Sequence, residues 1–417
     1  LKAGLLISVD GTIHDMYQLG LVGKPNTGKT TFFSASTLVD AKIAPYPFTT
    51  IDANKGVGYI RIKCVCKELG VKDDPRNSIC IDGNRFVPIE VIDVAGLVPD
   101  AWRGRGLGNK FLDELRRAHV LVHVVDASGS TDLEGRLVKP GAHDPLEDVK
   151  FLEREIDMWI YQIVKKDWDR MARSVEAGRG NLSLVLAERL SGLGVLEKHV
   201  LAALEESDLS DKRPSSWSDE DLYRFISSLR KKSKPMLIAA NKADKDEALE
   251  NIKRLKEELR GKYHVIPTCA EAELALRRAA LKGVVRYLPG DSSFEIVDEK
   301  GLSAGQLKAL EYIEEKVLKR WGSTGVQEVL NKAFLDVLGM MVVFPVGDEQ
   351  KLSDHEGRVL PDAFLVPGGT TARELAYLIH TEIGDKFMYA IDVKAKRKVA
   401  GDHVLRHRDV IKIVTRR

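Results

Sequence analysis

Cysteine, aromatic residues and long apolar stretches are all scarce in this chain of 417 residues. Four cysteines are too few for a disulfide-stabilised scaffold, so the sequence favours a reducing compartment, the cytoplasm. The longest apolar stretches, residues 3–9 and 120–125, are far shorter than the roughly 20 residues of a membrane-spanning helix, which argues against a membrane protein. The chain also lacks a large net charge, because its 64 Lys and Arg residues nearly balance its 62 Asp and Glu residues. Any contact with nucleic acid must therefore come from a local basic patch.

The chain is nevertheless 44% hydrophobic, enough to bury hydrophobic cores, and its length indicates two or three domains. We expect residues 1–15, which precede Met16, to be an N-terminal extension or edge strand rather than a targeting sequence. Acidic Asp10 and Asp15 follow their short apolar run where a cleavage site would need small residues. The rest divides into three predicted domains: residues 16–143 with 233–338, residues 144–232, and residues 339–417.

The first of these domains has the pattern of a doubly wound α/β fold. Uninterrupted apolar runs are typical of strands in a parallel sheet that is covered on both faces. Mostly apolar runs of this kind occur at residues 17–22, 87–92, 120–125 and 236–240, and residues 265–267 are a further candidate. Helical stretches alternate with them, beginning with residues 31–38. We therefore predict the doubly wound sheet of a P-loop NTPase.

Residues 144–232 form a predicted all-helical insertion into this domain. Apolar residues such as Val149, Leu152 and Ile156 recur there at helical spacing, and Ser218 with Asp221 marks a fresh helix start. We expect these apolar stripes to pack against one another rather than to bind a partner.

The C-terminal part changes character after a helical stretch at residues 303–337. From residue 340 on, short β runs surround one helix, which we predict from Thr371 to Gly384 with Glu374 completing a capping box. Strands around a single helix in so short a segment are typical of a β-grasp, ubiquitin-like domain.

A complete phosphate-binding motif follows the first predicted strand and precedes a helix. Its glycines allow backbone amides to surround phosphate at a helix N-terminus. Lys29 is placed to reach the β- and γ-phosphates, and Thr30 to ligate Mg²⁺. The expected nucleotide contacts are Gly23, Lys24, Pro25, Asn26, Thr27, Gly28, Lys29, Thr30 and Thr31.

Two further motifs end predicted strands and indicate a guanine nucleotide. In Asp93-Val-Ala-Gly96, the aspartate can hold Mg²⁺ through water and the Gly96 amide can sense the γ-phosphate. In Asn241-Lys242-Ala-Asp244, the final carboxylate can accept hydrogen bonds from guanine N1 and N2, which are donors that adenine lacks. Cys269 and Ala270 follow the next strand, and we expect the Ala270 amide to meet guanine O6.

These motifs, with Tyr46-Pro-Phe-Thr-Thr50, Asp93-Val-Ala-Gly-Leu97 and the glycine-rich residues 104–111, resemble those of the Obg/YchF group of GTPases related to translation factors. The C-terminal module looks like a TGS domain. YchF proteins proper have an altered base-specificity motif and favour ATP, whereas this chain keeps residues 241–244 intact. It therefore resembles the archaeal and fungal sister branch, with GTP as the expected ligand. The resemblance also implies that Thr50, rather than Thr49, joins Thr30 and Asp93 at Mg²⁺.

Many GTPases place a glutamine after the D-x-x-G motif to orient the attacking water, but this chain has Leu97 there. We therefore expect slow hydrolysis, supported by Lys29, Thr50 and Gly96, and we assign no catalytic base. Asn26 occupies the position at which related GTPases hold K⁺, so K⁺ is a candidate cofactor. The alternative is that Asn26 only shapes the loop.

Other chemistry-bearing residues give weaker signals. Cys64-x-Cys66 and Cys80 lack a fourth ligand and the spacing usual for a metal site, so we expect reduced, partly buried thiols. His119 and His123 lie beside or within an apolar strand, and we interpret them as core or surface residues rather than catalysts.

The C-terminal end concentrates positive charge. Residues 394–417 hold nine basic and two acidic residues, a net charge of +7 against +2 for the whole chain. We predict a GTPase switch whose TGS-like domain contacts the ribosome or RNA, with GTP, GDP and Mg²⁺ as ligands. Two alternatives stay open: a metabolic P-loop phosphotransferase, and a nucleotide-binding scaffold with little hydrolysis.

Overall fold

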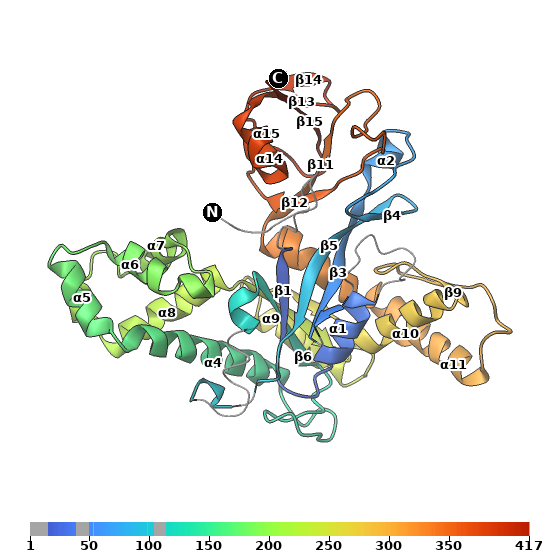
Figure 1. The fold of residues 1–417 in the computed structure, drawn as a ribbon. Coiled ribbons are helices and arrows are strands. Elements are labelled where there is room, and N and C mark those ends of the chain that lie inside the picture. Colours follow the sequence, from blue (N-terminus) through green and yellow to red (C-terminus); the bar gives the residue numbers. More distant parts are fainter. Residues whose placement is uncertain (1–15, 39–49, 53, 98, 104–113, 417) are drawn as a thin grey trace. The chain divides into compact units, whose positions relative to one another are not determined.

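The computed structural model describes residues 16–38, 50–52, 54–97, 99–103 and 114–416 (Figure 1). Residues 1–15, the predicted extension, lie outside this description. The chain divides into two compact units. The P-loop unit comprises Leu19–Ala35 and Ile92–Val329, and the β-grasp unit comprises Leu1–Gln18, Ser36–Val91 and Leu330–Arg417.

The P-loop unit contains the predicted parallel sheet. Its strands pair in the order β1 (Gln18–Val22), β6 (Val120–Asp126), β7 (Met236–Asn241) and β8 (Val265–Pro267). Val122 lies opposite Leu21 on one side and Leu237 on the other. Every residue of β6 and β7 is buried, which explains why their sequences are almost entirely apolar.

Helices of this unit include α1 (Lys29–Thr37), α9 (Ala248–Glu258), α10 (Ala270–Leu281) and α11 (Ala304–Ile313). The stretch predicted at residues 303–337 is helical but interrupted. From α11 it continues through a π-helical turn (Glu314–Leu318) and α12 (Lys319–Trp321), then stops at Gly322, whose φ is 80°. It resumes as α13 (Val326–Lys332) and a second π-helical turn (Ala333–Val337).

The helical insertion consists of α4 (Pro145–Lys165), α5 (Trp168–Glu176), α6 (Leu182–Arg189), α7 (Glu197–Glu206) and α8 (Asp219–Ser233), shown in green in Figure 1. The apolar stripe of α4 belongs to the same core as β6, and the rings of Trp168 and Trp217 lie 4.9 Å apart. The prediction that these stripes pack in the core is confirmed. So is the capping box of Ser218 and Asp221.

The C-terminal part of the β-grasp unit is a five-stranded sheet. It is built from β11 (Met340–Val346), β12 (Phe364–Pro367), β13 (Phe387–Asp392), β14 (Arg397–Val399) and β15 (Val410–Thr415). Their order is β12-β11-β15-β13-β14, with β11 and β15 parallel. Leu375 packs with Val343 and Ile411 in its core.

The helix of this domain is two helices, so the prediction of one from Thr371 to Gly384 is wrong. α14 (Ala372–Ile379) begins with the predicted capping box of Thr371 and Glu374. At His380 the backbone is extended, with φ −166° and ψ 139°, and the imidazole accepts a hydrogen bond from Glu382 N. This side chain therefore caps a second helix, α15 (Thr381–Asp385).

Both units contain elements that were not predicted from the sequence. The β-grasp unit also holds β2 (Thr50–Asp52), β3 (Lys55–Lys63), α2 (Val65–Glu68), β4 (Ile79–Ile81) and most of β5 (Asn84–Asp93), which is longer than predicted. The P-loop unit holds a short hairpin of β9 (Val285–Arg286) and β10 (Glu295–Ile296), and single 3-10 turns at Ala101–Arg103, Ser191–Leu193 and Pro214–Ser216. Among the described residues, no helix has the length and apolar character to span a bilayer.

Candidate nucleotide-binding site

The loop of residues 23–28 joins β1 to α1 and requires glycine at two positions. Gly28 has a φ of 93°, and a Cβ atom there would lie 2.3 Å from Nδ2 of Asn241. Gly23 has a φ of 144°, and its Cβ atom would lie 2.6 Å from the carbonyl oxygen of Val124. Asn26 also has a positive φ, 63°, which asparagine tolerates better than most residues. The backbone of this loop is therefore specified by its own sequence and its close neighbours.

Three side chains expected at phosphate and Mg²⁺ lie together where α1 begins. Nζ of Lys29 donates a hydrogen bond to the carbonyl oxygen of Lys24 over 2.8 Å, and burial lowers the pKa of Lys29 to about 8 against the opposing effect of Asp93. Oγ1 of Thr30 donates to Oδ2 of Asp93 over 2.8 Å. Burial raises the pKa of Asp93, and Thr30 and Lys29 partly oppose it. A hydroxyl and a carboxylate oxygen at this distance suit a hard cation such as Mg²⁺.

Residues 93–97 lie against the phosphate-binding loop. A Cβ atom on Gly96 would lie 3.4 Å from Nζ of Lys29, so Gly96 is beside the expected γ-phosphate ligand. The backbone N–H of Leu97 donates to the carbonyl oxygen of Gly23 over 3.1 Å, while its side chain is only 2% exposed within the core. Leu97 is therefore a packing residue, which agrees with the absence of a water-orienting side chain at this position.

Asn241 connects the phosphate-binding loop to the loop before α10. Its Nδ2 donates to the carbonyl oxygen of Thr27 over 2.8 Å, and its Oδ1 accepts from the backbone N–H of Ala270 over 3.0 Å. The Ala270 amide, which the sequence analysis expects at guanine O6, thus has Asn241 as its partner in this structure. The Asn241 side chain therefore fixes the phosphate-binding loop and the loop before α10 relative to each other.

Asp244 is the buried carboxylate of the base-specificity motif, 8% exposed. It accepts hydrogen bonds from the thiol of Cys269 over 3.3 Å and from the hydroxyl of Tyr312 over 3.0 Å, and Nζ of Lys245 lies 2.9 Å from it. Burial acts to raise the pKa of Asp244, but these donors, led by Lys245, outweigh it and hold the pKa below its ordinary value. The site therefore presents an ionised carboxylate, the acceptor that guanine N1 and N2 require.

Lys24 departs from the role expected of it, because its side chain points away from the loop. The side chain is 1% exposed, and its Nζ lies 2.8 Å from Oδ2 of Asp148 and 2.8 Å from the carbonyl oxygen of Thr131. Asp148 also lies 2.7 Å from Nε2 of His143. A buried carboxylate on α4 attracts the ammonium group, which leaves only the backbone of Lys24 to contact a nucleotide.

Residues 126–135 contact two side chains of the predicted nucleotide site, although no motif in the sequence marks them. Nζ of Lys242 lies 2.9 Å from Asp126, at the end of β6. Nδ2 of Asn26 donates to the carbonyl oxygen of Gly135 over 2.9 Å. The only sequence signal is the polar run that directly follows β6.

Several predicted residues have no described role here. Thr49 and residues 104–111 lie outside the described residues, and Thr50 begins β2 in the β-grasp unit. His119 is half-buried, and His123 is 1% exposed, where burial lowers its pKa to about 3. His123 is therefore a neutral core residue, as expected.

Comparison with family models agrees with the arrangement of these motifs. Residues 18–161 match a family described as 50S ribosome-binding GTPase. Residues 239–348 match the G4 motif-containing domain of the Obg-like GTPase YGR210-like family, and residues 340–415 match the TGS domain.

Individual proteins are similar over nearly the whole chain. The uncharacterized GTP-binding protein MJ1332 of Methanocaldococcus jannaschii is 54% identical, covering 96% of this chain and 99% of that protein. The ribosome-binding ATPase YchF of Bacillus subtilis is 26% identical, covering 92% and 90%. The crystal structure of a GTP binding protein from Pyrococcus horikoshii OT3 matches with a TM-score of 0.76 and 43% identity, covering 95% of this chain and 99% of that one.

Proposed function

The chain belongs to the YchF-type Obg-like GTPases of the YGR210-like branch, and we propose that it binds GTP and GDP and hydrolyses GTP to GDP and phosphate. The observation that carries this proposal is the convergence of three loops around Asn241 and Lys29. The phosphate-binding loop, residues 93–97 and the loop before α10 are joined by side-chain hydrogen bonds. Such a site presents a cation and backbone amides to phosphate, and a carboxylate to the base.

Guanine rather than adenine is the proposed base, although the Bacillus subtilis relative is named an ATPase. We propose that Asp244 selects guanine over adenine. Substituting Asp244→Asn should weaken GTP binding by about 30- to 1,000-fold, equivalent to roughly 2–4 kcal/mol, and should favour xanthosine triphosphate. The matched control is Asp246→Asn, an exposed aspartate two residues away. Equal affinity of the unmodified protein for ATP and GTP, measured by fluorescence titration, would contradict the assignment.

Magnesium fits the oxygen pair of Thr30 and Asp93, and we propose Thr50 as a further ligand from the family resemblance. Thr30 and Asp93 would hold Mg²⁺, which would supply positive charge to neutralise the phosphates. Thr30→Val should remove most of the difference in GTP affinity between buffers with Mg²⁺ and with EDTA. Thr37→Val, at the last residue of α1, is the control that should keep this difference.

Hydrolysis should be slow without a partner, because Leu97 is buried in the core and cannot orient water. Potassium is the proposed accelerator. Nδ2 of Asn26 already donates a hydrogen bond to the carbonyl oxygen of Gly135, so Oδ1 of Asn26 is the atom that would hold K⁺. Equal turnover in KCl and NaCl at matched ionic strength would leave Asn26 with only its loop-shaping role. Turnover that stays negligible in KCl and with ribosomes would instead favour a nucleotide-binding scaffold.

The partner we propose is the ribosome or its RNA, contacted in the cytoplasm through the TGS domain. The Bacillus subtilis relative is named a ribosome-binding ATPase, and this chain has a TGS domain, so we propose ribosome binding for this chain as well. Four of the C-terminal basic side chains that the structure describes have acidic partners. Lys394 and Arg408 pair with Glu68 and Lys412 pairs with Glu349, while the exposed Arg397 lies 4.0 Å from Asp392. The exposed residues 396–398, in the turn between β13 and β14 and at the start of β14, are the better candidates.

The test is a triple substitution of Lys396, Arg397 and Lys398 to alanine. Ribosome co-sedimentation should weaken and its salt dependence should flatten by roughly 0.7 in log K per log salt for each lost contact to single-stranded RNA. A matched triple, Lys165, Lys166 and Arg170 to alanine, removes equal charge from exposed positions of the helical insertion. Loss of binding only in that second variant would place the contact on the insertion.

A further inference from the structure

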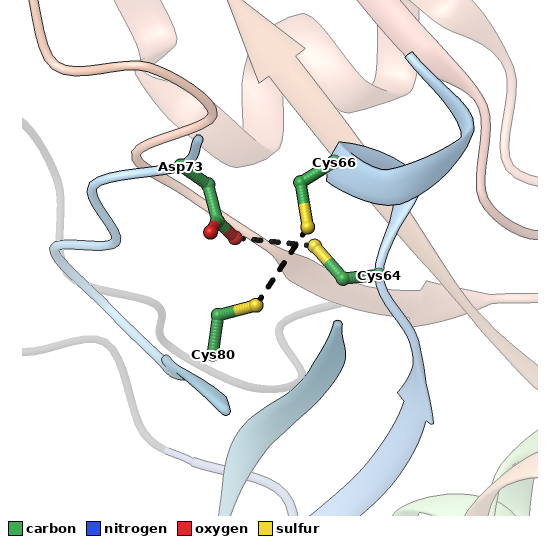
Figure 2. A group of neighbouring side chains, drawn as sticks. All are labelled: Cys64, Cys66, Asp73 and Cys80. Atoms are coloured by element: carbon green, nitrogen blue, oxygen red, sulfur yellow. Dashed lines mark hydrogen bonds between the residues drawn. The ribbon is translucent and has the colours of Figure 1, made fainter. Parts of the chain in front are cut away.

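Three cysteines and one aspartate of the β-grasp unit converge on a single point (Figure 2). Cys64 lies between β3 and α2, Cys66 lies in α2, Asp73 lies in the loop that follows, and Cys80 lies in β4. Their sulfur and carboxylate ligand atoms all lie within 4.8 Å of one another. The cysteine spacing in the sequence indicates no fourth ligand, whereas the structure places Asp73 beside the three cysteines.

The spacing of these atoms fits a small tetrahedral ion. Sγ of Cys66 lies 3.8 Å from Sγ of Cys80, and Sγ of Cys64 lies 3.2 Å from Oδ2 of Asp73. Zinc–sulfur bonds of about 2.3 Å in a tetrahedron place two sulfur atoms about 3.8 Å apart. An iron–sulfur cluster does not fit, because its four protein ligands are shared among two or four iron atoms and are therefore spread more widely than these four.

The charge and the burial of the cluster also favour a bound cation. Cys64 and Cys66 are 2% and 3% exposed, and the neighbouring cation is Arg85, whose guanidinium lies 2.9 Å from Asp73. One guanidinium does not balance a carboxylate and three thiolates, whereas a divalent ion stabilises all four ligands in their anionic form.

We propose that Cys64, Cys66, Asp73 and Cys80 bind one Zn²⁺ ion in a closed structural site. Four protein ligands fill the coordination sphere of zinc and leave no position for a substrate. The site lies in the lobe of residues 64–85, which contacts the C-terminal residues 359–363. The backbone N–H of Asp74 donates to the carbonyl oxygen of Val359 over 2.8 Å, and Arg76 forms an ion pair of 2.5 Å with Asp362. Zinc therefore holds together the loop that makes these contacts.

The test measures zinc directly in the full-length protein, purified under reducing conditions without a metal-affinity tag. Elemental analysis should find about one zinc per chain, and Cys80→Ser should lower zinc affinity by more than the roughly 10- to 100-fold that loss of an outer-shell partner costs. Cys269→Ser, which changes the one cysteine outside the cluster, should keep its zinc. Reconstitution with Co²⁺ should give the visible d–d bands of tetrahedral, thiolate-ligated cobalt.

A gain-of-ligand variant keeps the proposal testable if Cys80→Ser fails to fold. Asp73→Cys should retain zinc and strengthen the thiolate-to-cobalt absorption, because it adds a fourth sulfur ligand. If Asp73 serves only as the partner of Arg85, this variant should lose stability without any gain in the cobalt spectrum. Three results would overturn the proposal: no zinc uptake by the reduced protein, a Cys66–Cys80 disulfide in the reduced preparation, or bound iron with sulfide in place of zinc.

Discussion

The nucleotide-binding site and the cysteine cluster are both built from buried polar groups, but their charge balance is opposite. Around the phosphate-binding loop, Lys24 and Lys242 each have a carboxylate partner, while Nζ of Lys29 donates to a neutral carbonyl. In the cysteine cluster, acidic groups outnumber the single guanidinium of Arg85. The first arrangement favours a polyanion and the second a cation, so local charge balance indicates the class of ligand in each case.

The largest expected effect tests how strongly the buried lysine of the nucleotide site depends on its partner. Lys24→Met should lower the free energy of unfolding by about 3–5 kcal/mol, because Asp148 would stay buried without its cation. Urea denaturation measures the change. The double variant Lys24→Met with Asp148→Leu should recover most of it. A loss below about 1 kcal/mol in the single variant would show that the pair is not a buried charge pair in solution.

The second prediction concerns Lys29, whose Nζ has a carbonyl oxygen rather than a carboxylate as its hydrogen-bond acceptor in the part of the chain that the structure describes. Lys29→Ala should weaken GTP binding by about 30- to 1,000-fold, since a charge-assisted contact to phosphate is lost, while the free energy of unfolding changes little. Titration with a fluorescent GTP analogue checks the affinity. Lys332→Ala, which removes a surface lysine of α13, should bind normally. Unchanged affinity in Lys29→Ala would place the phosphates elsewhere.

The third prediction tests whether the region around the phosphate-binding loop excludes a further positive charge. Burial and the nearby lysines lower the pKa of His123 to about 3 in the folded chain, against an ordinary value of 6.5. The unfolded chain therefore binds the extra proton, and stability falls by about 1.4 kcal/mol per pH unit as pH drops from 6.5 toward 3.

His123→Leu should remove this share of the acid sensitivity, measured as urea stability at pH 7 and pH 5. His355→Leu, which changes an exposed histidine, should leave the slope unchanged. An identical slope in the His123→Leu variant would mean that this imidazole becomes charged in the folded protein.

The smallest effect concerns the base-specificity carboxylate. Tyr312 donates a hydrogen bond to Asp244, and a guanine base would compete for the same acceptor. Tyr312→Phe should therefore tighten GTP binding by about 5-fold, the equivalent of one net hydrogen bond of about 1 kcal/mol. Tyr377→Phe removes a similar hydroxyl–carboxylate contact in the β-grasp unit and serves as the control. Weaker binding in Tyr312→Phe would mean that the hydroxyl supports the bound state instead.

Local sequence was enough to predict the elements whose stability depends on near neighbours. The strands β6 and β7 are buried on both faces, so nearly all of their residues are apolar. Helix starts at Ser218 and Thr371 were visible because both partners of a capping box lie within one turn. The phosphate-binding loop was equally visible, since its glycines and Lys29 act within eight consecutive residues.

The tertiary structure alone decided which distant residues share a site. Asp148 lies 124 residues from Lys24, and Asp73 reaches the cysteines only because the chain folds back between α2 and β4. No spacing in the sequence encodes such meetings, because they depend on how whole elements pack. The break between α14 and α15 was equally unpredictable. The sequence pattern indicates one continuous helix, but the His380 imidazole caps a second helix at this point. Sequence thus determined the motifs and the core strands, and packing over long sequence separations determined their partners.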